Sequence, residues 1–247
     1  MEERTEGTTT ATVTPRSDTG HWAKPVARLA TVERGGALNA NVEGRRINPA
    51  AGGFGRLFQK TFSVQVGSSV TPQELIGIWK TRFGEFWPKG QKMFLPAGGI
   101  APGEVGLINA SIPGTPTMAT GVLVIYADNE SFSFMSPEGH PFAGPLTFSA
   151  HVDEFGFTVA QVQELTRASD PFWELAMMVP VLGERMQNDL WRQTLRNLAR
   201  SFGVDATVHE RIVCVDRRRQ WRNAKNVWHN AGIRSGLSAP LRLLRRR

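Results

Sequence analysis

The sequence predicts an α+β fold in which a curved antiparallel sheet closes around a long C-terminal helix. Four strand-like runs follow one another from Thr117 to Thr166, with connections too short for the crossovers that parallel strands require. A long helical pattern then extends from Pro171 to Phe202. A sheet curled around one helix encloses apolar space, and such space commonly holds a small molecule.

The elements before this sheet have signals of their own. Apolar and polar residues alternate from Leu57 to Val66, which predicts a half-buried strand. Lys60 is the one polar interruption on the apolar side of that strand. The sequence Thr71-Pro72-Gln73-Glu74 is a capping box, so a helix is expected from there to Pro88. A weaker strand is expected from Glu104 to Ile112.

The strands of the main sheet are each bounded by turn residues. Their predicted ranges are Thr117–Ala127, Ser131–Ser136, Leu146–Asp153 and Phe157–Thr166. The helix that follows is expected to be kinked or divided at Pro180 and to end at Gly203. A last short strand is expected from Thr207 to Val215.

Composition divides the chain into three parts. Residues 1–54 are rich in Thr, Gly, Arg, Asn and Pro without a sustained period, so a largely disordered N-terminal segment is expected. Residues 55–204 form the expected domain, and residues 205–247 a basic tail. Residues 211–247 hold 11 of the 29 basic residues and one of the 22 acids, which leaves the rest of the chain at a net charge of −3. The high isoelectric point therefore describes the tail and not the domain.

One stretch resembles a known superfamily. The run Phe132-Ser-Phe-Met-Ser-Pro-Glu-Gly-His-Pro141, followed by Gly144-Pro-Leu-Thr-Phe148, is similar to an uncharacterised bacterial branch of the START-like helix-grip superfamily, and Gln187 also fits. That superfamily includes polyketide cyclases and lipid-transfer domains. The resemblance implies an enclosed cavity for a hydrophobic small molecule, either a lipid or a biosynthetic intermediate. For an enzyme, it implies a cofactor-independent cyclase or dehydratase acting on a polyketide-like substrate.

Three residues are candidates for acid–base chemistry on such a ligand: His140, Tyr126 and Glu138. His140 lies in a loop framed by glycine and proline that could direct an imidazole to a cavity mouth. The alternative is a turn whose histidine caps a neighbouring strand. Tyr126 ends the most apolar strand, where its hydroxyl needs a partner, either a ligand or a backbone carbonyl.

The ligand-binding candidates are the apolar residues Trp79, Phe83, Trp173 and Met186. They fall on the elements that would face the sheet's concave side, where the same pattern also fits plain core packing. Trp79, Phe83 and Tyr126 are expected to form the wall of a pocket of about 300–1,000 Å³, the usual range for ligand sites.

Several chemistries and locations are excluded or disfavoured by the sequence. The five histidines are scattered and Cys214 is the only cysteine, so neither a metal site nor another cofactor is expected. The glycine pairs do not stand between a strand and a helix, as a phosphate-binding loop requires. The lone cysteine and an N-terminal stretch without an apolar run favour a cytoplasmic protein.

The basic tail supports a second hypothesis, an interaction protein. Residues 217–247 place Trp221 and Trp228 on one side of an expected helix, among arginines and lysines. Such a segment can lie on an anionic membrane, which would make the protein peripheral there, or it can bind nucleic acid. The membrane is the preferred partner of the two. The alternatives are a solubilising disordered tail and a segment packed on its own domain.

Overall fold

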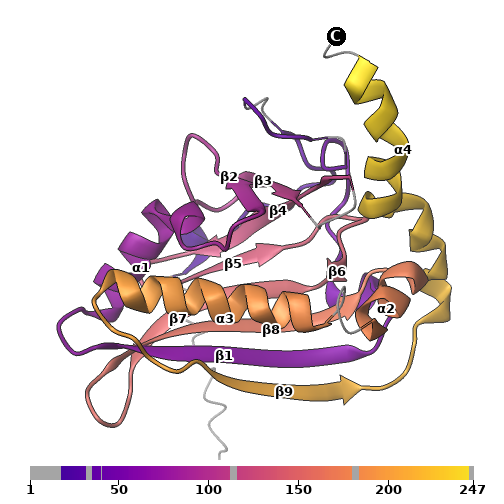
Figure 1. Ribbon diagram of the computed structural model, residues 1–247. Helices are drawn as coiled ribbons and strands as arrows, with labels where there is room; N and C mark the ends of the chain where they lie inside the picture. Colours follow the sequence, from indigo (N-terminus) through magenta and orange to yellow (C-terminus); the bar gives the residue numbers. More distant parts are fainter. Residues whose placement is uncertain (1–17, 32–34, 40, 112–115, 180–183, 245–247) are drawn as a thin grey trace, which may run out of the picture.

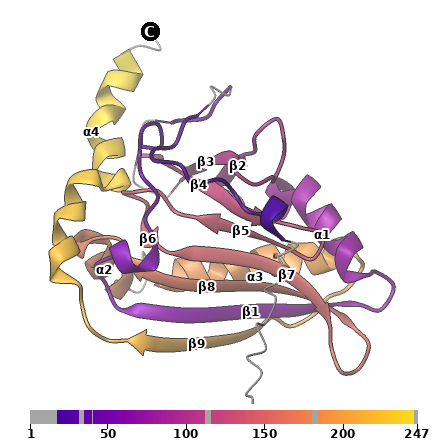
Figure 2. The same ribbon diagram turned by 180° about the vertical axis from the view of Figure 1, so that it is seen from behind.

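The computed structural model describes residues 18–31, 35–39, 41–111, 116–179 and 184–244, except for the side chains of residues 184, 186 and 239–244. Figures 1 and 2 show one curved sheet with a long helix across its concave face. The expected division of that helix at Pro180 lies outside the described residues.

Within the described residues, the strands form one antiparallel sheet in the order β2-β3-β4-β5-β7-β8-β1-β9, with β6 paired to β8 beside this path. The strands are β1 (Leu57–Gly67), β2 (Gln91–Phe94), β3 (Val105–Ala110), β4 (Met118–Ala127), β5 (Ser131–Met135), β6 (Phe142–Ala143), β7 (Pro145–Val152), β8 (Thr158–Ala168) and β9 (His209–Asp216). The sequence pattern missed the short strands β2 and β6.

The helices lie at defined places on this sheet (Figure 1). They are α1 (Pro72–Thr81), α2 (Pro171–Met178), α3 (Glu184–Ser201) and α4 (Ala231–Leu244), with 3-10 turns η1 (Thr19–His21), η2 (Ala50–Gly52), η3 (Phe83–Glu85) and η4 (Trp221–His229). Helix α3 packs on β1 and β8, while α1 and α2 lie toward opposite ends of the sheet. The predicted fold class, a curved antiparallel sheet gripping a long helix, is confirmed.

The local signals act as predicted in α1 and α3. At the start of α1, the Thr71 hydroxyl accepts from the Glu74 amide at 3.2 Å, and the Thr71 amide donates to the Glu74 carboxylate at 2.9 Å. Gly203 follows α3 with φ +78°, a left-handed conformation that glycine adopts without strain.

The opposite, convex face of the sheet is covered by the N-terminal segment. Leu29 and Val42 are buried against Leu107 and Leu123, which point away from α3. The expectation of a disordered segment up to residue 54 is therefore wrong for the described residues from 18 to 54. Apolar residues too sparse to show a period still bury themselves when the sheet supplies the partner surface.

The domain also continues past the expected boundary at residue 204. Strand β9 pairs along β1, so it belongs to the sheet and not to a separate tail. The segment after it is tied to the domain by asparagine side chains of η4. Asn223 donates to the carbonyls of Ala51 and Gly53, and Asn226 donates to those of Gly52 and Ser169. Of the alternatives for the described part of the tail, the structure has the packed one.

The buried side chain of Arg167 on β8 also holds the C-terminal segment on the domain. Its buried guanidinium donates to the carbonyls of Gly55 and Arg218, at 2.7 and 2.9 Å, and pairs with the Asp216 carboxylate at 2.7 Å. The hydrogen bonds from Arg167 and Arg218 hold the pKa of Asp216 well below its usual range. One buried side chain thus joins β8, the start of β1 and the end of β9.

The C-terminal segment also packs closely against Gly139, in the loop between β5 and β6. Gly139 has φ +88°, and its carbonyl accepts from the amide of Ala231 at 2.9 Å. A Cβ at this position would lie 2.0 Å from the carbonyl oxygen of His229. The loop therefore has room only for glycine.

Gly139→Ala should consequently destabilise the protein through this contact. Gly156→Ala is the matched control, because Gly156 also has a positive φ, +81°, but nothing within 4 Å of the added Cβ. The control should lose about 1–2 kcal/mol of unfolding free energy from the left-handed backbone alone. Gly139→Ala should lose a further 1–3 kcal/mol or so from overpacking, measured by denaturant unfolding. Equal losses in both variants would contradict the packing of the C-terminal segment on this loop.

Candidate ligand pocket

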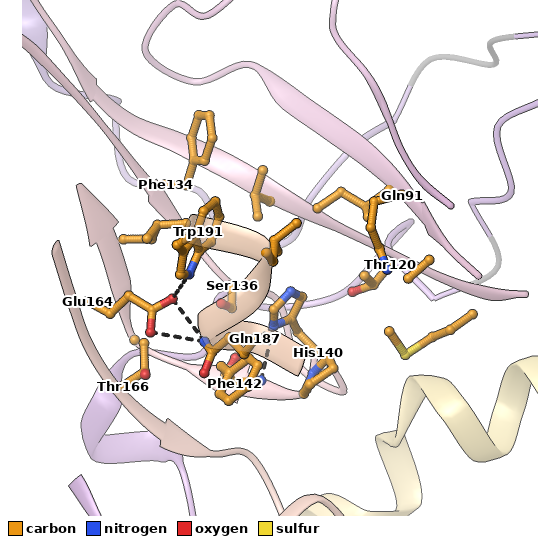
Figure 3. Close-up of a pocket in the computed structure, with 18 of the residues that line it drawn as sticks. Gln91, Thr120, Phe134, Ser136, His140, Phe142, Glu164, Thr166, Gln187 and Trp191 are labelled. Carbon is orange, nitrogen blue, oxygen red and sulfur yellow. Dashed lines mark hydrogen bonds between the residues drawn. The ribbon is translucent and has the colours of Figure 1, made fainter. Parts of the chain in front are cut away.

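A partly open pocket of about 140 Å³ lies between α3, α2 and the strands β2 to β5. Figure 3 shows its lining side chains. The lining residues are Trp87, Gln91, Met93, Ile108, Ala110, Met118, Thr120, Val122, Phe134, Ser136, His140, Pro141, Phe142, Gly144, Leu146, Glu164, Thr166, Trp173, Met177, Gln187, Leu190 and Trp191. The pocket is mostly apolar, as expected, but smaller than the expected range.

The other end of the space under α3 is filled by aromatic rings. Trp79, Phe83, Phe132 and Phe148 are all fully buried. Their ring centroids lie 4.7–6.0 Å apart where they touch, mostly edge to face. Trp191 marks the boundary, because it packs against this cluster and also lines the pocket. The aromatic cluster therefore confines the pocket to the α2 end of the sheet.

A buried polar network joins α3 to the sheet at one wall of the pocket (Figure 3). The Glu164 carboxylate on β8 accepts from Gln187 Nε2 at 2.9 Å on both oxygens and from Trp191 Nε1 at 2.5 Å. Lys60, buried on β1, donates to Gln187 Oε1 at 2.8 Å and Asn188 Oδ1 at 3.0 Å. Burial raises the pKa of Glu164, and the Lys60 charge acts in the opposite direction.

Sequence reasoning did not select Glu164, although a signal existed. Lys60 interrupts the apolar side of β1, and Glu164 interrupts the buried side of β8 in the same way. The two residues face each other in the register of the strands. Two interruptions of opposite charge on neighbouring strands indicate a buried polar contact.

Three residues of the pocket hold polar atoms without a partner. Among the described residues, five buried side-chain atoms lack a hydrogen bond, and three of these, Trp87 Nε1, Thr120 Oγ1 and Trp173 Nε1, belong to pocket residues. Thr120 is labelled in Figure 3 beside Gln91. Because buried polar groups are nearly always paired in native proteins, these three atoms are positions where a water molecule or a ligand oxygen would form a hydrogen bond.

His140 lines the same pocket from the loop between β5 and β6. Its Nδ1 lies 3.0 Å from the Phe142 carbonyl oxygen and 3.1 Å from the Phe142 amide nitrogen. Burial lowers the pKa of His140 to about 4, so the imidazole is neutral at neutral pH. If Nδ1 accepts from the amide, Nε2 carries the proton and donates; if Nδ1 donates to the carbonyl, Nε2 is a proton acceptor.

The four predicted ligand-binding residues are not found together at the pocket. Trp173 lines the pocket. Trp79 and Phe83 do not, because both are packed within the aromatic cluster. The side chain of Met186 lies outside the described residues.

Tyr126 is on the other face of the sheet. A register shift between Val124 and Tyr126, where β4 meets β5, displaces the alternation of β4. The Tyr126 ring accordingly packs on Trp22, with centroids 4.7 Å apart, and its hydroxyl donates to Asp128. That hydrogen bond raises the pKa of Tyr126 to about 12.

Glu138 is also absent from the pocket lining. Its carboxylate accepts from the backbone amide of Arg46 at 3.2 Å, and its own amide donates to the Arg46 carbonyl at 2.8 Å. It faces a separate surface groove beside η4. Of the three predicted acid–base residues, only His140 is brought to the pocket.

Fold and pocket together define a helix-grip protein with an apolar pocket at one end of its closing helix. The predicted arrangement, a curved antiparallel sheet around a closing helix, is present. Among the described residues, no group of acidic, histidine and cysteine side chains could hold a metal ion, and no helix is both long and apolar enough to cross a membrane.

Comparison with solved structures gives similarities at the level of chain arrangement. The chain resembles the protein Ms6760 from Mycobacterium smegmatis, with 11% identity over 60% of this chain and 92% of that one, at a TM-score of 0.43. It resembles the KanY protein, with 8% identity over 61% of this chain and 99% of that one, at a TM-score of 0.46. It also resembles the di-domain ARO/CYC StfQ from the steffimycin biosynthetic pathway, with 13% identity over 59% of this chain and 50% of that one, at a TM-score of 0.42. No family model and no curated protein matches the sequence.

The lowered pKa of His140 predicts how stability depends on pH. Above pH 6.5 the imidazole is neutral in both the folded and the unfolded chain. Between pH 6.5 and about 4 the unfolded chain binds the proton and the folded chain does not, so the unfolding free energy decreases as the pH is lowered. His140→Asn keeps a hydrogen-bonding atom near Nδ1 but cannot titrate. Relative to this variant, the wild type should lose up to about 3 kcal/mol of unfolding free energy across that window. A difference that stays constant from pH 7.5 to 4 would show that His140 is not held neutral.

Proposed function

We propose that the protein binds a compact hydrophobic molecule that carries one or more hydrogen-bonding oxygen atoms. The observation that carries the proposal is the presence of three unpartnered polar atoms, on Trp87, Thr120 and Trp173, around an otherwise apolar pocket. Leaving such an atom buried and unpaired typically costs about 1–3 kcal/mol, which a suitable ligand would recover.

The dimensions of the pocket limit the ligand. A volume of about 140 Å³ is below the usual 300–1,000 Å³ of small-molecule sites. A ring system or short chain is therefore a better match than a lipid with two long acyl chains. Of the two ligand classes that the sequence suggested, these dimensions favour the biosynthetic intermediate over the lipid.

The indole and hydroxyl groups suggest which oxygen atoms the ligand carries. The Nε1 atoms of Trp87 and Trp173 can only donate, so they pair with carbonyl or hydroxyl oxygens. The Thr120 hydroxyl can donate or accept. A molecule with ketone or phenol oxygens on an apolar frame meets these requirements, and a polyketide-like intermediate is of that kind.

His140 is the residue we propose for any acid–base step on this ligand. Its imidazole is neutral and lines the pocket, and its Nδ1 is fixed by the backbone of Phe142. Cyclisation and dehydration of a polyketone both begin with proton transfer next to a carbonyl, which Nε2 can perform in the tautomer with the proton on Nδ1. Such a reaction needs no cofactor.

A second candidate function is binding of an anionic membrane, or of nucleic acid, through residues 217–247. The rings of Trp221 and Trp228 are 73% and 79% exposed, which favours it. However, η4 is a 3-10 helix with three residues per turn, so side chains seven residues apart point about 120° from each other. The two tryptophans therefore do not share one face, and Trp221 also packs edge-on against Phe54. We rank this function second.

Native mass spectrometry of the purified protein, followed by extraction of bound molecules, is the direct test of the first proposal. A co-purified oxygenated compound of low mass would support it. A diacyl lipid in the extract would contradict the proposed size limit.

The role of Thr120 can be tested with two model ligands that differ in one oxygen, 1-tetralone and tetralin. Wild-type protein should bind 1-tetralone more tightly by roughly fivefold, the effect of one hydrogen bond. Thr120→Val should remove most of this preference, read from the fluorescence of the pocket tryptophans. Thr194→Val is the control, because Thr194 Oγ1 is also buried without a partner among the described residues but lies outside the pocket lining.

Both variants should be as stable as the wild type or more so, since each removes an unpaired buried hydroxyl. The same loss of preference in Thr194→Val, or no binding of either model ligand, would contradict the proposed recognition.

A further inference from the structure

A second concave site lies on the surface between the N-terminal segment and η4, separate from the apolar pocket. It is a groove of about 410 Å³ lined by Arg28, Arg46, Glu138, Lys225, Asn226, Trp228 and His229. It shares no lining residue with the apolar pocket. The proposed function gives it no role.

The charges in the groove are unbalanced. Arg28, Arg46 and Lys225 contribute three cations, and Glu138 is the one carboxylate in the lining. Within the part of the chain that the structure describes, the side chains of Arg46 and Lys225 make no hydrogen bond or ion pair. The Arg28 guanidinium donates to the backbone carbonyl of Gly44 at 2.8 Å.

The backbone segments that carry these cations are held together by the fold. Arg46 is fixed through its backbone, which exchanges two hydrogen bonds with Glu138. Lys225 is on η4, and the neighbouring Asn226 anchors η4 to the carbonyls of Gly52 and Ser169. The cations thus come from segments that are far apart in the sequence but are joined in the fold by these backbone contacts. Like charges held together in this way repel one another, and an anion between them relieves the repulsion.

His229 continues the same electropositive region behind the groove. Its Nδ1 lies 2.6 Å from Nη1 of Arg45, which fixes the ring at the groove wall. Burial and the nearby charge of Arg234 lower the pKa of Arg45, while Glu138 raises it. One further arginine, Arg45, therefore contacts the groove wall.

Trp228 gives the groove a second kind of surface. Its side chain is 79% exposed, although it is large and apolar, and it lines the groove together with the three cations. An exposed indole can stack on a planar group, and an exposed aromatic side chain beside charged residues is common at binding sites.

We propose that this groove binds a phosphate group joined to a planar apolar group, as in a soluble aryl phosphate ester. Arg28, Arg46 and Lys225 bind the phosphate oxygens, and Trp228 stacks on the planar group. Arginine and lysine are the side chains that bind phosphate most strongly, through charge-assisted hydrogen bonds. A concave groove lined by three cations and a single indole suits one such molecule better than a flat lipid surface.

Phenyl phosphate and inorganic phosphate are the probes that separate the two contributions. By isothermal titration calorimetry at low salt, the wild-type protein should bind phenyl phosphate more tightly than inorganic phosphate. Arg46→Gln and Lys225→Gln should each weaken the binding of both probes by about tenfold, the loss of one charge-assisted contact. Trp228→Ala should reduce phenyl phosphate to the affinity of inorganic phosphate.

Arg222→Gln is the matched control for charge. Arg222 is an exposed cation of the same 3-10 helix that does not line the groove. Its removal should leave both affinities within about twofold. Equal weakening in Arg222→Gln and Lys225→Gln would overturn the proposal, because it would show that diffuse charge and not the groove binds the probes.

Vesicles distinguish a lipid phosphate from a soluble one. The same amount of protein should co-sediment with phosphatidylcholine vesicles whether or not they contain phosphatidylglycerol. Phenyl phosphate should bind to the protein when no vesicles are present. Binding to the phosphatidylglycerol vesicles alone, with no heat from phenyl phosphate, would overturn the proposal and assign the groove to membrane headgroups. The substituted side chains are exposed, so unchanged melting temperatures should accompany every result.

Discussion

The buried contact between Glu164, Gln187 and Lys60 fixes the position of the closing helix on the sheet. A buried carboxylate and a buried ammonium are tolerated only when their hydrogen bonds are made, and here α3 supplies the groups that make them. Sliding the helix by one turn would leave both charges without these partners. Apolar packing brings α3 to the concave face, but this network determines where along the face it stops.

The position of α3 in turn decides where the pocket lies. Trp191 donates to Glu164 and so holds its ring between the aromatic cluster and the open end. On one side of that ring, side chains of α1 and the central strands fill the space completely. On the other side the lining side chains do not fill the space, and the pocket remains. The loop that carries His140 borders this end, and the backbone of residues 229–231 packs against it at Gly139.

Much of the fold could be predicted because its signals are local. Alternation indicated β1 with Lys60 as an anomaly, the capping box indicated α1, and Gly203 indicated the end of α3. The helix-grip arrangement follows from the order of these elements.

The parts that could not be predicted depend on contacts between distant residues. Asn223 and Asn226 anchor the C-terminal segment by donating to carbonyls of residues 51–53 and 169, and asparagines in a basic segment give no sign of this. Tyr126 changes faces because of a register shift that no residue pattern announces. Trp79 and Phe83 were correctly assigned to the inward side, but periodicity cannot tell a filled core from a lined cavity. The loop around His140 could be predicted from the sequence alone, because it depends only on the neighbouring glycine and prolines.

The pairing of β1 with β8 and β9 has a consequence for synthesis on the ribosome. β1 is the first strand to emerge, yet both of its neighbours in the sheet are made last. Until residue 168 has left the ribosome, the backbone donors and acceptors of β1 lack both neighbouring strands, and the edge toward β9 stays unpaired until residue 216 has emerged. A chain that stops before β9 would be left with an open apolar strand edge, which favours pairing with other chains. In the finished sheet the edge on this side is β9, whose exposed residues include the charged Glu210 and Arg211, which oppose such pairing, as well as Ile212 and Val213. A strand that waits long for its neighbours in the nascent chain is thus paired along both edges in the folded protein.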